Sequence, residues 1–240
     1  YAVGVTLGLY FLTLGNVING FILPKAVQSI YNNNSAKILT KEMIKVSRVT
    51  MIVLFYILGG FLILGQEFVI LWVGETYKES WFVALLIMVA FVIPISQGYA
   101  HAILEAKKMM RFKSLTSLIL TTIGIILGGY LSTIYGLKGI IYGIFGALII
   151  LQVIVLFYYQ LKLELNMQHY FTKALLPFLT LFTIVSTISY YAFKPLEIGW
   201  LFFILKGGCY TVFFASGLFI VLNKNERNYL LQSLKRKSAI

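Results

Sequence analysis

The sequence predicts an all-α polytopic membrane protein with seven transmembrane helices, and three observations support this fold class. Sixty per cent of the 240 residues are hydrophobic, only 12% are charged, and the mean hydropathy is +0.89. A soluble domain of this length has no core large enough to hide so much apolar surface. The apolar residues also form seven runs, most of them close to the roughly 20 residues that a helix needs to cross a bilayer.

The seven predicted spans are almost uncharged and lack the two-residue alternation of a barrel strand. In chain order they are Tyr1–Pro24, Val49–Gln66, Phe82–Leu104, Ser114–Leu137, Gly139–Leu161, Ala174–Phe193 and Ile198–Asn223. Pro94 lies in the middle of the third span and should kink it. Small residues four apart predict close helix packing, and they are Gly4 and Gly8, Gly124 and Gly128, and Gly139, Gly143 and Ala147.

The distribution of Lys and Arg between the loops predicts the orientation. Sixteen of the 20 basic residues lie in alternate loops and the C-terminal tail, three lie in the other loops, and Lys206 lies within a span. Because Lys and Arg mark the cytoplasmic side of a span, we expect the N-terminus outside and the C-terminus inside. The formal charge of +12 comes from basic residues of which all but Lys206 lie in loops or the tail, where they meet anionic lipid headgroups, and this placement argues against a nucleic-acid partner.

The first basic segment, residues 25–48, carries an amphipathic pattern. Leu39, Met43 and Val46 recur at i, i+4 and i+7 among lysines, which predicts a helix within Ser35–Arg48 that lies on the cytoplasmic membrane surface. The tail, residues 224–240, places Leu230 and Leu234 beside basic residues, so we expect it to lie at the membrane surface as well, and neither segment is expected to be a separate domain.

The residue types that carry most catalysis are scarce. The chain has no Asp, its single cysteine is Cys209, and its two histidines, His101 and His169, lie in different segments. We therefore predict no catalytic residues, no metal site and no cofactor, so that the chain is not an enzyme.

Four polar side chains in the spans are candidates for a functional site. Thr13, Asn16 and Asn19 recur at i, i+3 and i+6 on the first span, and Gln97 lies near the inner end of the third. Amide groups in hydrocarbon need partners, so these residues should face protein or water. Either they line a hydrophilic cavity, or they form interhelical hydrogen bonds that only hold the bundle together.

Three ionisable residues are further candidates, and two roles are open for each of them. His101 and Glu105 share a helical face and could relay protons, or they are solvated at the cytoplasmic mouth, where Glu105 can pair with Lys108. Lys206 lies within the last span, where it either extends outward as an interfacial anchor or attracts an anionic substrate along the transport path.

Four stretches of the chain match one known family in their order and spacing, and they are Phe21–Lys25, Phe68–Tyr77, Ala102–Lys108 and Gly136–Ile140. In these stretches the chain resembles the polysaccharide-biosynthesis flippases of the multidrug/oligosaccharidyl-lipid/polysaccharide exporter superfamily. The resemblance covers nearly the whole chain, and it rests on order and spacing because no single motif is diagnostic.

The resemblance implies helices eight to fourteen of a fourteen-helix, two-lobe transporter, in the orientation that the charges predict. Residues 1–161 would then form the C-terminal lobe, residues 162–223 two additional spans, and residues 224–240 the cytoplasmic tail. Because the chain starts at Tyr1 inside an apolar run, we expect an N-terminal half to precede it. In relatives the basic residues that bind the diphosphate lie largely in that half, so most substrate-binding residues would lie outside this chain.

The implied function is the flipping of a polyprenyl-diphosphate-linked oligosaccharide across a bacterial cytoplasmic membrane by alternating access. One alternative is a cation-coupled multidrug exporter of the same superfamily, which should carry ionisable residues deep in its spans. A more distant alternative is a membrane-embedded acyltransferase or glycosyltransferase, against which the missing Asp and the scarce His argue.

Overall fold

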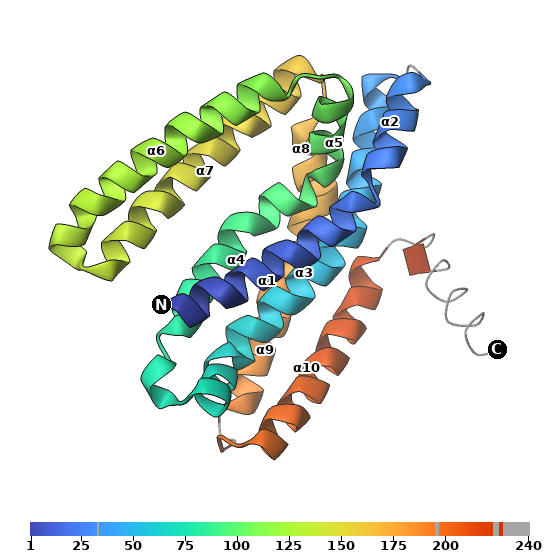
Figure 1. Cartoon of the computed structure of the whole chain (residues 1–240). Coiled ribbons are helices and arrows are strands. Elements are labelled where there is room, and N and C mark those ends of the chain that lie inside the picture. The colour runs from blue at the N-terminus through green and yellow to red at the C-terminus, as the bar shows by residue number, and fades with distance from the viewer. Residues whose placement is uncertain (33, 195–196, 223–225, 228–240) are drawn as a thin grey trace.

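The computed structural model describes residues 1–32, 34–194, 197–222 and 226–227, and all its regular structure in these ranges is helical (Figure 1). Seven helical stretches in them are long and apolar enough to cross a membrane, so the chain is a multi-pass membrane protein. The elements are α1 (Ala2–Gly20), α2 (Leu23–Tyr31), α3 (Ala36–Val73), η1 (Glu75–Tyr77), α4 (Ser80–Ser96), α5 (Gly98–Ala106), α6 (Met110–Tyr135), α7 (Leu137–Lys162), α8 (Met167–Tyr170), the π-helical η2 (Phe171–Leu175), α9 (Leu176–Phe193) and α10 (Trp200–Val221).

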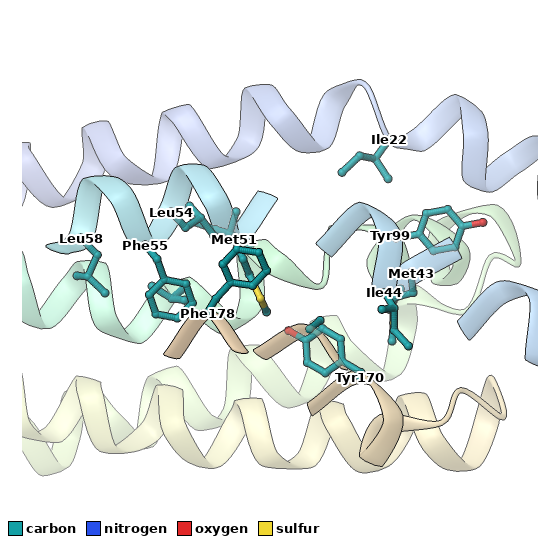
Figure 2. Packing of buried hydrophobic residues seen from close by; sticks show 14 of the residues in the cluster. Ile22, Met43, Ile44, Met51, Leu54, Phe55, Leu58, Tyr99, Tyr170 and Phe178 are labelled. Atoms are coloured by element: carbon teal, nitrogen blue, oxygen red, sulfur yellow. The ribbon is translucent and has the colours of Figure 1, made fainter. Parts of the chain in front are cut away.

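Helix α3 is the central element, and it packs against α4, α5, α9 and α10. Its inward face is mainly apolar, and Met51 and Leu54 on it are completely buried, but Ser47 and Arg48 are buried there too. Figure 2 shows Met51, Phe55 and Phe178 meeting between α3 and α9. The two C-terminal spans are thus packed directly on the centre of the bundle.

The start of α3 differs from the separate surface helix that the sequence predicts. Residues 36–48 continue without interruption into the span, and the whole helix of 38 residues is about 57 Å long at 1.5 Å per residue. Leu39 and Met43 are buried inside the protein, and Thr40 accepts a hydrogen bond from the backbone N–H of Asn166 at 3.1 Å. The apolar pattern was real, but protein rather than lipid covers it, which a periodicity alone cannot distinguish.

The third predicted span consists of two helices, because α4 ends at Ser96 and α5 begins at Gly98. Figure 1 shows the change in direction between them. Pro94 has no N–H to donate and lies three residues before the break, as expected for a proline-induced kink. The Ser47 hydroxyl on α3 donates to the freed carbonyl of Ser96 at 2.6 Å, so the break is held by a neighbouring helix.

Glycines make two close helix contacts, as their spacing predicts. On α1, Gly4 and Gly8 face α4, and a Cβ added to Gly8 would lie 2.7 Å from the side chain of Ile87. Helices α6 and α7 form an antiparallel hairpin in which Gly128 faces Gly143 backbone to backbone. The hairpin turns at Gly136 alone, whose φ of 59° suits a residue without a side chain.

Exposed basic residues gather at one end of the bundle, where α2, the start of α3, α5 and α8 lie (Figure 1). We call this the basic end. Its exposed basic side chains include Lys37, Lys41, Lys45, Lys107, Lys108 and Arg111.

Candidate functional site

The α4–α5 break carries a buried polar cluster, which we call the break cluster and which consists of Ser47, Ser96, Gln97, Gln152 and Tyr170. The Ser96 hydroxyl shares a hydrogen bond of 2.7 Å with the Tyr170 hydroxyl, and Gln152 donates to the Gln97 side-chain carbonyl at 2.8 Å. These residues come from α3, α4, α7 and α8 and the residue between α4 and α5. Gln97 itself is 1% exposed, although it interrupts a strongly apolar stretch.

Asn19 reaches the same break from α1. A Cβ on Gly98 would overlap the Asn19 side chain, so the glycine lets the asparagine approach the α5 backbone. The Asn19 Oδ1 atom and the Gln97 Nε2 atom are both buried, and neither has a hydrogen-bond partner among the described residues. The structure therefore brings together two of the sequence candidates, each with one unsatisfied polar atom, which costs free energy in an apolar setting.

Thr13 and Asn16 lie on the part of α1 that faces away from α4, and both are exposed. The Thr13 hydroxyl donates to the carbonyl of Leu9 one turn earlier at 3.0 Å, so it is satisfied within its own helix. Asn16 presents an exposed amide within the 19-residue candidate span Ala2–Gly20, about one turn before its end. The predicted polar stripe therefore divides, with Asn19 turned inward and the other two residues uncovered.

His101 and Glu105 follow Gln97 at successive turns along α5. Burial decreases in that order, from the buried Gln97 through the half-buried His101 to the exposed Glu105. Helix α5 lies beyond the candidate span Glu75–Ser96. Burial, and after it the positive charge of Lys113, lower the pKa of His101, which keeps the imidazole neutral at pH 7. No hydrogen bond joins His101 to Glu105 in the described part of the chain, so a proton relay would need an intervening water.

Lys206 lies apart from the other candidates, near the end of the bundle opposite the basic end. Its ammonium donates to the Glu67 carboxylate at 2.8 Å and to the carbonyl of Glu197 at 3.0 Å. The side chain is 5% exposed, and it extends toward the start of α10, where protein groups cover its ammonium. The ion pair satisfies the charge within the protein.

Three buried or partly buried polar residues were not predicted from the sequence. Gln152 and Tyr170 belong to the break cluster, and Arg48 on α3 pairs with Glu226. Gln152 was visible as an amide inside the fifth apolar run, a signal equal to that of Gln97. Tyr170 and Arg48 offered no such signal, because both lie at the ends of predicted spans, where aromatic and basic residues are ordinary.

The chemistry open to these residues is hydrogen bonding through amides and hydroxyls. The described part of the chain holds no group of three or more His, Cys, Asp or Glu residues that could bind a metal ion. No family model, curated protein or solved structure matches the chain.

Proposed function

We propose that the chain forms the C-terminal part of a transporter that flips a polyprenyl-diphosphate-linked oligosaccharide by alternating access. The observation that supports this proposal most directly is the uncovered amide of Asn16 on α1, which lies among exposed apolar side chains such as Leu14 and Val17. An exposed amide such as that of Asn16 is costly against lipid, where no partner is available. Water in a hydrophilic path, or a second lobe that closes on α1, would satisfy it.

A hydrophilic path suits a substrate whose headgroup is polar and whose tail is apolar. The sugar–diphosphate headgroup would travel along the α1 side of the bundle while the polyprenyl tail stays in the surrounding lipid. No bond is made or broken in such a step, so the scarcity of catalytic residue types is compatible with it. The second lobe, which we assign to an N-terminal half of the same protein, would supply the opposite wall.

The basic end then faces the cytoplasm of a bacterial cell, where its lysines and Arg111 meet anionic lipid headgroups. This orientation places the α4–α5 break toward the inner side of the membrane, so that the amides of Asn19 and Gln97 lie near the cytoplasmic entrance.

The test measures lipid-linked sugar exposed outside cells that express the full-length gene in a deletion background. A double variant, Thr13→Val with Asn16→Leu, should reduce exposed sugar several-fold at equal membrane expression. The control is Val17→Leu, which alters an exposed apolar residue of the same helix and should leave export unchanged.

Unaltered export by the double variant would contradict the polar-path assignment. Unaltered sugar exposure in the gene deletion, with increased drug sensitivity, would support the cation-coupled exporter instead.

A further inference from the structure

One end of α10 is tied to α3 by a buried ion pair. Lys206 lies on the second turn of α10 and contacts Glu67 of α3 at 2.8 Å, with side-chain exposures of 5% and 11%. The second oxygen of Glu67 accepts the backbone N–H of Gly199, the residue before α10, at 3.3 Å. Glu67 thus holds both a lysine of α10 and the backbone where this helix begins.

The other end of α10 is tied to α3 by Arg48. Its guanidinium makes a bidentate pair with Glu226, at 2.7 and 2.8 Å, and donates to the carbonyl of Val221, the last residue of α10, at 2.9 Å. It also donates at 2.6 Å to the carbonyl of Lys173, which lies in the π-helical turn before α9. The ring of Phe178 lies 5.3 Å from the guanidinium carbon.

The two ion pairs have opposite polarity. Helix α3 contributes the cation at the basic end and the anion at the opposite end, and its partners are Glu226, which follows α10 in the chain, and Lys206 of α10. Arg48 and Glu67 are 19 residues apart, which is about 28 Å along a helix and close to the thickness of the hydrocarbon layer. Between them Tyr210 donates to the carbonyl of Tyr56 at 3.0 Å, so α10 contacts α3 along its length.

We propose that the two ion pairs act as a clamp that fixes α10 on α3, so that α3, α9 and α10 move as one rigid body during the working cycle. A slide of α10 by one turn, about 5.4 Å, would break the Lys206–Glu67 pair and the hydrogen bond from Arg48 to the Val221 carbonyl, and it would leave buried charges unpaired. Because the charges on α3 have opposite signs at its two ends, α10 can pair with α3 in only one alignment along the helix axis. Conformational change is then left to α1, the α4–α5 break and the α6–α7 hairpin.

The first test is thermal stability of the full-length protein in detergent. Glu67→Gln and Lys206→Met should each lower Tm by about 5–10 °C, because each leaves the partner charge buried. The double variant, Glu67→Gln with Lys206→Met, should lose less than the sum of the two single losses, because it leaves no buried charge without its partner. The control is Glu75→Gln, which removes the exposed pair with Lys78 at 3.7 Å and should leave Tm unchanged. Single variants as stable as the control would overturn the clamp.

The second test cross-links the two helices in a Cys209→Ser background. Leu64→Cys and Gly207→Cys suit a short bifunctional thiol reagent, because the two positions face each other and a Cβ on Gly207 would lie 4.0 Å from the Leu64 Cδ1 atom. Only this test depends on the proposed function. Export should persist after cross-linking, and a cross-link that stops export would refute the rigid body. If the full-length protein exports no sugar even without the cross-link, the proposed function fails. The thermal-stability test then decides by itself whether the clamp exists.

Discussion

The sharpest stability prediction concerns Gly143, at the closest contact between α6 and α7. A Cβ at this position would overlap the backbone N and Cα of Gly128 and lie 2.7 Å from the carbonyl oxygen of Gly124. Backbone atoms cannot turn aside as a flexible side chain can, so Gly143→Ala must push the helices apart. Overpacking of this kind costs about 1–3 kcal/mol. The higher helix propensity of Ala returns about 0.5–1 kcal/mol, which leaves a net loss of roughly 1–2 kcal/mol.

The same helix offers a matched control, because a Cβ on Gly146 meets nothing within 4 Å. Gly146→Ala should be neutral or slightly stabilising, whereas Gly143→Ala should lower Tm by about 2–8 °C for a chain of this size. Thermal unfolding of the two variants in the same detergent measures both effects. Equal Tm values for the two variants, or a larger loss at Gly146, would refute the inference that backbone contact closes the hairpin.

Three further predictions follow from the charges and the break cluster. In a cysteine-free background, a cysteine at Lys78 should react with an impermeant thiol reagent in intact cells and one at Lys108 should not; the opposite pattern would reverse the orientation. Gln152→Leu leaves the buried Gln97 carbonyl without its donor and should cost about 1–3 kcal/mol in thermal unfolding; no loss would show that the bond is dispensable. Because the pKa of His101 is lowered below 6.5, the unfolded chain binds its proton first as the pH falls. Stability should therefore fall below pH 6.5, and His101→Asn should weaken that dependence; an unchanged pH profile would refute it.

The fold class and the spans could be predicted from the sequence because hydrophobic length and helical period are local properties. The glycine contacts of α1 and of the α6–α7 hairpin were predictable for the same reason, since spacing alone sets which residues share a helix face. The start of α3 was not predictable in this way. An amphipathic stripe indicates that something apolar covers it, and only the packing of α5 and α8 shows that the cover is protein.

The ion pairs could not be predicted, because each joins residues far apart in the chain. Lys206 and Glu67 are 139 positions apart, and Arg48 and Glu226 are 178 apart. From the sequence alone Lys206 was a single charge in an apolar run, for which a functional role is the ordinary first hypothesis. Glu67 was a loop residue next to the second span. Only the fold places the two side chains within one hydrogen bond of each other.

The polar side chains of the spans therefore fall into two groups: those that have hydrogen-bond or ion-pair partners within the chain, and those that do not. Arg48 and Lys206 are fully engaged with carboxylates and backbone carbonyls. Among the described residues, four buried side-chain polar atoms lack a hydrogen-bond partner; two are serine hydroxyls on α9, and the other two are the amide atoms of Asn19 and Gln97. The exposed amide of Asn16 lies one turn from Asn19. Because unmet hydrogen-bonding capacity is what a polar ligand or a polar partner surface can satisfy, α1 and the α4–α5 break are the places to look for one, and the charged clamp is not.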